Sequence, residues 1–144
     1  MIMDKPVKYR FMVLEDDEIF MELNQRVIHK SGLASELTCF NYAQLGLDEI
    51  GLRIREGRPL PDFLLLDLRM PMINGFEFLE KLNQLHQPPM ENMKIHLLTS
   101  SMDENDIERA FSHPHVFGFL SKPLSLKKIE QVVSAKVPIR PAGI

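Results

Sequence analysis

"FLLLDLRMPMINGF", residues 63–76, joins an uninterrupted apolar run to a carboxylate and then to a loop. Four consecutive apolar residues are typical of a strand that is buried on both faces, as in a parallel sheet. Asp67 follows at once, and Pro71 and Gly75 mark the loop after it. Because an isolated buried charge is costly, this aspartate should be paired, bound to a metal or placed at the exposed end of the strand.

Similar apolar runs recur along the chain and alternate with segments whose apolar residues have helical spacing. Strands are expected over 9–14, 36–40, 63–67, 94–99 and 116–121. Helices are expected over 18–30, 42–56, 75–86, 103–112 and from Ser125 to about Ala135, with Asn41 and Ser125 as caps of the second and fifth. This alternation predicts βαβ units, so the fold class is α/β with a five-stranded parallel sheet and helices on both faces.

Finer expectations concern helix faces and connections. The first helix presents Ile19, Phe20, Leu23 and Val27 on one face, and the third should bury Leu85 with its other apolar residues. The connection over 51–62 is long, so either the second helix is extended or a surface insertion lies there. Residues 87–92 are expected to form a loop, and the Pro-rich segment 136–144 is expected to fray.

Composition narrows the class of protein. The chain has 144 residues, 44% of them hydrophobic, which suits a single domain (1–144, with a core over about 9–135). A net charge of -3 and the lack of a basic stripe argue against nucleic acid as a partner. The single cysteine, Cys39, excludes an internal disulfide and reads as a buried thiol in a reducing compartment. No apolar stretch is long enough to span a bilayer, so a soluble cytoplasmic protein is expected.

Chemistry is expected at the carboxyl ends of the strands, where open parallel α/β sheets bind ligands. The polar residues that follow the strands are Glu15, Asp16, Asp17 and Glu18 after the first, Asp67 after the third, Thr99, Ser100 and Ser101 after the fourth, and Ser121 and Lys122 after the fifth. Carboxylates brought together repel one another and require a cation, and oxygen ligands of this kind suit Mg²⁺. A carboxylate can also accept a phosphoryl group, a reaction that depends on positioning and charge neutralisation.

Each of these features has an ordinary explanation when taken alone. The run "EDDE" could favour a helix dipole, Lys122 could be a surface lysine, and Thr99 with Ser100 could open a helix. Asp67 is harder to explain in this way, because it ends the most apolar strand. The ordered combination on successive strand ends therefore favours a phosphoryl site.

With these residues assembled, the chain resembles the receiver domains of response regulators in two-component signalling. The resemblance rests on "VLEDDE" (13–18), "FLLLDLRMPMINGFEFL" (63–79), "LLTSS" (97–101) and "FLSKP" (119–123), and it extends from about Tyr9 to Val133. It implies a doubly wound, flavodoxin-like sheet with strand order 2-1-3-4-5. It also implies that the protein is not an enzyme in the ordinary sense, beyond its own phosphorylation and dephosphorylation.

The resemblance assigns roles residue by residue. Asp67 matches the phosphoacceptor, and Glu15, Asp16, Asp67 and the backbone carbonyl of Arg69 match the Mg²⁺ ligands. Leu68, Ser100 and Lys122 match phosphoryl contacts, while Thr99 and Phe119 match the switch pair. Phe119 has no ring hydroxyl, so its part in a switch must depend on packing. The Lys122–Pro123 bond is often cis in this family.

Two alternatives to this function remain at the sequence level. A dehalogenase-like aspartyl-phosphate phosphatase would need a second acid two residues after Asp67, where this chain has Arg69. A receiver-like module that mediates contacts without being phosphorylated would share the same fold.

The expected partners are proteins. A histidine kinase or histidine phosphotransfer protein should dock near Phe20, Leu23 and Asn24. An output protein or a second copy of the chain should bind the segment 103–135.

Overall fold

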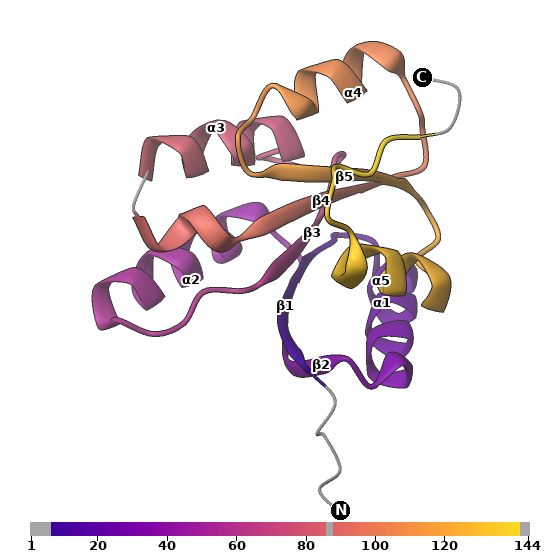
Figure 1. Cartoon of the computed structure of the whole chain (residues 1–144). Coiled ribbons are helices and arrows are strands. Elements are labelled where there is room, and N and C mark those ends of the chain that lie inside the picture. The colour runs from indigo at the N-terminus through magenta and orange to yellow at the C-terminus, as the bar shows by residue number, and fades with distance from the viewer. Residues whose placement is uncertain (1–6, 86–87, 142–144) are drawn as a thin grey trace, which may run out of the picture.

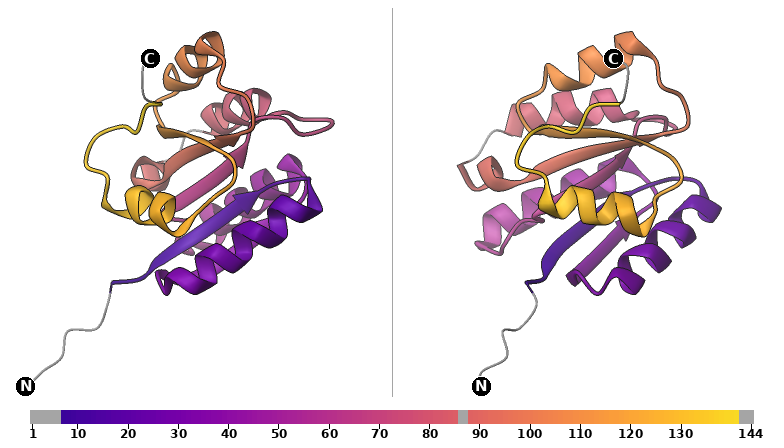
Figure 2. Two further views of the ribbon diagram at one scale, coloured as in Figure 1. Left: turned by 90° about the vertical axis from the view of Figure 1, so that its right-hand side faces the viewer. Right: turned by 45° about the vertical axis from the view of Figure 1, so that its right-hand side comes forward.

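A computed structural model of the chain describes residues 7–85 and 88–141 and consists of one five-stranded sheet with helices on both faces (Figures 1 and 2). All pairings are parallel, in the order β2-β1-β3-β4-β5, so the predicted fold class and strand order are confirmed. The strands are β1 (Tyr9–Leu14), β2 (Ala34–Phe40), β3 (Phe63–Asp67), β4 (Lys94–Thr99) and β5 (Val116–Ser121). The helices are α1 (Glu18–Ser31), α2 (Ala43–Glu56), α3 (Gly75–Leu85), α4 (Glu104–Phe111) and α5 (Leu126–Ser134), with a 3-10 turn η1 (Pro88–Asn92) where a loop was predicted.

Two hydrophobic cores explain why the central strands are apolar throughout. Alternate side chains of a strand point to opposite faces, so Leu64 and Leu66 of β3 pack under α2, α3 and α4. Phe63 and Leu65 of the same strand pack under α1 and α5. The division of the helices between the two faces is visible in Figure 1, where α1 and α5 lie side by side. All five residues of β3 are buried, which places the Asp67 carboxylate at the end of the most buried strand.

The apolar face expected on α1 is only partly buried in the structure. The helix buries Asn24 and Ile28, whereas Ile19 is 71% exposed and Leu23 is 39% exposed. The helix begins at a cap, in which Asp17 Oδ1 accepts the backbone N–H groups of Ile19 and Phe20.

Some element ends also differ from those predicted. Leu85, at the end of α3, is 38% exposed, whereas Phe78, Leu79 and Leu82 are buried as predicted. Residue 86 of the predicted helix lies outside the described residues. The cap of α2 is Tyr42, not Asn41, and its side chain makes no cap hydrogen bond. Ser125 caps α5 as predicted, its Oγ accepting the Lys128 N–H. Cys39 is only partly buried.

The long connection before β3 is largely helix. α2 continues to Glu56 and ends at Gly57, whose φ of 68° lies in the left-handed region that favours glycine. The buried Arg53 guanidinium then holds the following segment, since Nη1 donates to the Pro59 carbonyl at 3.2 Å. Of the two explanations for the long connection, the extended helix is therefore correct.

The segment after α5 does not fray as predicted, up to the last described residue. The Ile139 N–H donates to the Phe117 carbonyl at 2.8 Å, and the Phe119 N–H donates to the Ile139 carbonyl at 3.0 Å. Arg140 pairs with Glu108 of α4 at 3.1 Å. Because β5 is an edge strand with free backbone groups, a segment that supplies partners and an apolar side chain is held against it.

Candidate functional site

Three carboxylates from two strand ends meet at the carboxyl edge of the sheet. Glu15 and Asp16 follow β1, Asp67 ends β3, and each offers an oxygen within 4.8 Å of the others. Glu15 and Asp67 are buried and Asp16 is partly exposed. Asp17 is not part of the cluster, because its side chain caps α1. The structure thus brings together the three acidic side chains that the sequence singled out.

Lys122 extends from the end of β5 into this cluster. Its Nζ lies 2.6 Å from Glu15 Oε1 and 3.3 Å from Asp67 Oδ1, and its side chain is only 8% exposed. The Lys122 N–H donates to the Thr99 carbonyl at 2.8 Å, and the Lys122–Pro123 bond is cis, as the resemblance implied. One ammonium therefore lies against two buried carboxylates, and the acidic cluster is only partly neutralised.

Hydroxyl groups from the end of β4 complete the rim of the site. Thr99 is buried, and its Oγ1 accepts the Ser101 N–H at 3.2 Å. Ser100 and Ser101 are exposed. A cavity of about 260 Å³ opens over Asp67 and is lined by Asp16, Asp17, Phe20, Asp67, Arg69, Thr99, Ser100, Ser101 and Lys122.

Three of the predicted residues, Glu15, Leu68 and Phe119, do not line this cavity, and Glu15 is buried beneath it against Lys122. The Leu68 side chain is buried, and its N–H makes a long hydrogen bond of 3.4 Å to the Leu98 carbonyl. Phe119 is 1% exposed and belongs to the core cluster that contains Ile107 and Ala110 of α4. The Phe119 ring therefore lies inside the hydrophobic core.

Sequence reasoning missed two contacts of the site. The centre of the Phe20 ring lies 4.4 Å from Lys122 Nζ and the residue lines the cavity, whereas the sequence placed it on a helix face and in a docking surface. Arg69 pairs with Asp106 of α4 at 3.3 Å, across 37 positions of the chain. Helical spacing could have placed Phe20 near the start of α1, whereas no local pattern links Arg69 to Asp106. Asn24, an expected docking residue, is buried and not available for such a contact.

Burial dominates the electrostatics of the site. It raises the pKa of Asp67 to about 6, assisted by the hydrogen bond to Glu15 and by repulsion from it, and opposed by Lys122 and the Arg69 N–H. Burial also raises the pKa of Asp16, with Asp67 adding to the effect. Both shifts mean that the site favours added positive charge.

The donor set fits a hard divalent cation. Glu15 Oε1 is buried and has no hydrogen bond within the part of the chain that the structure describes, its contact being the ion pair with Lys122. Carboxylate and carbonyl oxygens with an open side are the ligands that Mg²⁺ and Mn²⁺ accept. A divalent cation would therefore neutralise carboxylate charge that the single ammonium of Lys122 leaves uncompensated.

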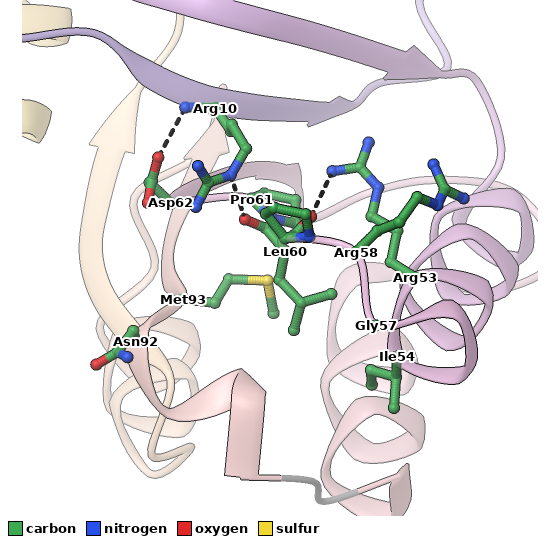
Figure 3. A pocket seen from close by; sticks show the side chains of 11 residues that line it. Arg10, Arg53, Ile54, Gly57, Arg58, Leu60, Pro61, Asp62, Asn92 and Met93 are labelled. Carbon is green, nitrogen blue, oxygen red and sulfur yellow. Dashed lines mark hydrogen bonds and ion pairs between the residues drawn. The ribbon is translucent and has the colours of Figure 1, made fainter.

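A second cavity, of about 330 Å³, lies at the opposite edge of the sheet (Figure 3). It is lined by Arg10, Arg53, Ile54, Gly57, Arg58, Pro59, Leu60, Pro61, Asp62, Asn92 and Met93. Its arginines are already paired: Arg10 bonds Asp62 and the Leu60 carbonyl, while Arg53 pairs with Glu36 and Glu49. These contacts hold the segment before β3 in place. The candidate functional site is therefore the carboxyl edge with Glu15, Asp16 and Asp67, called the acidic edge below.

The fold and the site together define a class: a doubly wound α/β domain with carboxylates, hydroxyls and a lysine at the carboxyl edge of its sheet. The chain belongs to the response regulator receiver domain family, whose profile matches residues 11–134. It is thus a receiver domain of two-component systems, a family whose members interact with kinases or phosphotransfer proteins and with output domains.

Individual relatives agree with this assignment. A probable methanogenesis regulatory protein, FilR2, from Methanothrix harundinacea is 30% identical over 122 residues, covering 85% of this chain and 77% of that protein. A two-component response regulator from Cytophaga hutchinsonii superposes with a TM-score of 0.81 at 25% identity, covering 90% of this chain and 96% of that one. The Mn²⁺-bound form of the response regulator Rcp1 superposes with a TM-score of 0.67 at 25% identity, covering 92% and 99%. Among the described helices, none is long and apolar enough to cross a membrane.

Proposed function

We propose that Asp67 accepts a phosphoryl group from the phosphohistidine of a histidine kinase or histidine phosphotransfer protein, in a Mg²⁺-dependent reaction that alters a protein-binding surface. The observation that carries the proposal is the meeting of three carboxylates within 4.8 Å, two of them against Lys122. The protein would act in the cytoplasm through protein contacts and would not bind nucleic acid itself.

The chemistry follows from the positions of these side chains. An oxygen of the Asp67 carboxylate attacks the phosphorus, a P–O bond forms, and the P–N bond breaks as the donor imidazole leaves with its electron pair and gains a proton. Lys122, 3.3 Å from Asp67, is positioned to neutralise the oxygens of the transferred group. Exposed Ser100 leaves the approach open, and the Thr99 hydroxyl, now held by the Ser101 N–H, is the nearby donor that could turn toward the phosphoryl group.

Glu15, Asp16, Asp67 and the Arg69 carbonyl would hold the divalent cation. When bound, Mg²⁺ supplies positive charge against the phosphoryl oxygens. The Mn²⁺-bound structure of the related Rcp1 supports a cation at this kind of site. The carboxyl arrangement also argues against the phosphatase alternative, since Arg69 occupies the position where that mechanism requires a second acid.

The proposed switch begins from a buried Phe119. Phosphorylation adds charge and acceptor oxygens at Asp67, and movement of Thr99 toward them would change the packing on which Phe119 and α4 depend. The response should therefore appear over α4, β5 and α5.

Acetyl phosphate provides a direct test. The wild-type protein should gain one phosphoryl adduct in intact-mass measurements with Mg²⁺, and little or none with EDTA. Asp67→Asn should give no adduct, whereas Asp62→Asn, at the opposite edge of the sheet, should behave like the wild type. Adducts of equal yield with EDTA, or on the Asp67→Asn protein, would refute the proposal.

A further inference from the structure

We propose that Arg69 reports the phosphorylation state of Asp67 to α4, by exchanging its ion pair with Asp106 for one with the phosphoryl group. This inference rests on the proposed function, because it requires that a phosphoryl group be present on Asp67. It concerns a positioning residue whose side chain does not itself take part in the transfer.

Arg69 touches both the phosphorylation site and α4. Its N–H donates to Asp67 Oδ1 at 3.2 Å, so its backbone is tied to the proposed acceptor. Its guanidinium lies 3.3 Å from Asp106 Oδ2, and its side chain lines both the cavity over Asp67 and the adjoining cavity that reaches Asp106. The side chain is 71% exposed, so no packing prevents it from moving between the two positions.

α4 is a short helix with few buried side chains. Within its eight residues only Ile107 and Ala110 are buried. On its polar side it is held by ion pairs, namely Asp106 with Arg69, Arg109 with Glu80 at 3.9 Å and Glu108 with Arg140 at 3.1 Å. The pair with Arg69 is the one among these that reaches the acidic edge.

Charge decides which partner Arg69 prefers. Asp106 presents one carboxylate at 3.3 Å, a single contact with the largely exposed Arg69 side chain. A phosphoryl group on Asp67 would carry about 1.5 to 2 negative charges and three acceptor oxygens, which match the forked guanidinium. Arg69 should therefore turn from Asp106 to the phosphoryl group, and α4 should lose its tie to the loop after β3.

The test is amide hydrogen exchange of α4 with and without saturating beryllofluoride and Mg²⁺, where beryllofluoride serves as the phosphoryl analogue. In the wild type, exchange at Ile107 and Ala110 should rise about two- to fivefold, as expected for the loss of one exposed ion pair. Asp106→Asn should show that rise without the analogue and little further change with it. Arg69→Gln, compared at its own saturating analogue concentration, should behave in the same way, and Arg69→Lys should keep part of the response.

Controls separate signalling from simple loosening of the helix. Glu108→Gln breaks another ion pair of α4, so it should raise basal exchange while keeping the response to beryllofluoride. The double variant Arg69→Gln/Asp106→Asn should exchange no faster than either single variant, because both remove the same contact. A wild-type-like response in Arg69→Gln or Asp106→Asn would overturn the inference, as would an unresponsive α4 in wild-type protein that forms the acetyl phosphate adduct. Absence of that adduct would instead overturn the proposed function, and this inference with it.

Discussion

At the scale of single residues, the acidic edge keeps charges in positions that oppose folding. Asp67 is 5% exposed, and its pKa is raised from 3.8 to about 6, chiefly by burial. Between these two values the native state binds more protons than the unfolded state, so stability falls as pH rises toward 6 and stays reduced at pH 7. A loss of folding stability of this kind is expected where a charged group is retained for its chemistry.

Asp67→Asn should therefore stabilise the protein at pH 7 without metal, by about 1–3 kcal/mol, because it removes the ionised carboxylate. Saturating Mg²⁺ should raise the urea midpoint of the wild type and have little effect on the variant. Asp62→Asn is the matched control and should destabilise, since that carboxylate is paired with Arg10. A metal-free Asp67→Asn protein less stable than the wild type would show that the carboxylate does not oppose folding.

His96 gives a separate dependence of stability on pH. It is fully buried between Phe63 and Phe117, neither ring nitrogen has a hydrogen bond within the described residues, and burial lowers its pKa to about 4. Between pH 6.5 and 4 the unfolded state binds more protons, so stability falls as pH falls through this window.

Between pH 7 and pH 4 the wild type should lose up to about 3 kcal/mol more stability than the His96→Leu variant, which has no imidazole to protonate. Urea unfolding at several pH values, compared with the exposed His29→Asn variant, measures the difference. Parallel pH profiles for wild type and His96→Leu would contradict a neutral buried imidazole.

At the scale of elements, patterns within a segment were predictable, whereas contacts between segments were not. The bounds of β1, β3, β4 and β5 were predicted from apolar runs, because burial on both faces leaves a signal at every position. The pairing of Ile139 with β5 depended on the free edge of that strand. This contact leaves no periodic signal in the segment after α5.

The buried Arg53 network is an element-scale contact of this kind. Its guanidinium joins α2 to Glu36 and Thr38 of β2 and to the Pro59 carbonyl before β3. Arg53→Met should lower the free energy of unfolding by about 1–3 kcal/mol, because it removes the one buried member of a network whose other members are partly exposed. Arg55→Met, exposed on the same helix, should change stability little. Equal urea midpoints for the two variants would assign no structural role to the network.

At the scale of the whole molecule, the sheet separates two kinds of charged edge. The amino edge holds arginines in closed pairs around the cavity of Figure 3. The carboxyl edge gathers Glu15, Asp16 and Asp67 around the ammonium of Lys122, which lies against Glu15 and Asp67. Topology alone predicted this second cluster from the sequence, because parallel strands place their ends together. The pairing of Arg69 with Asp106 could not be predicted in this way, since it depends on where α4 packs.

The most direct test of the central claim is the position of the phosphoryl group on the chain. After reaction with acetyl phosphate and Mg²⁺, borohydride reduction converts an aspartyl phosphate to homoserine, which tandem mass spectrometry locates in a peptide. We expect homoserine at position 67 and no reduced carboxyl at Glu15 or Asp16, in a yield that falls when EDTA replaces Mg²⁺. Reduction at Asp16 or Glu15, or no reduced residue in a protein that carries the adduct, would contradict the assignment of Asp67 as the phosphoacceptor.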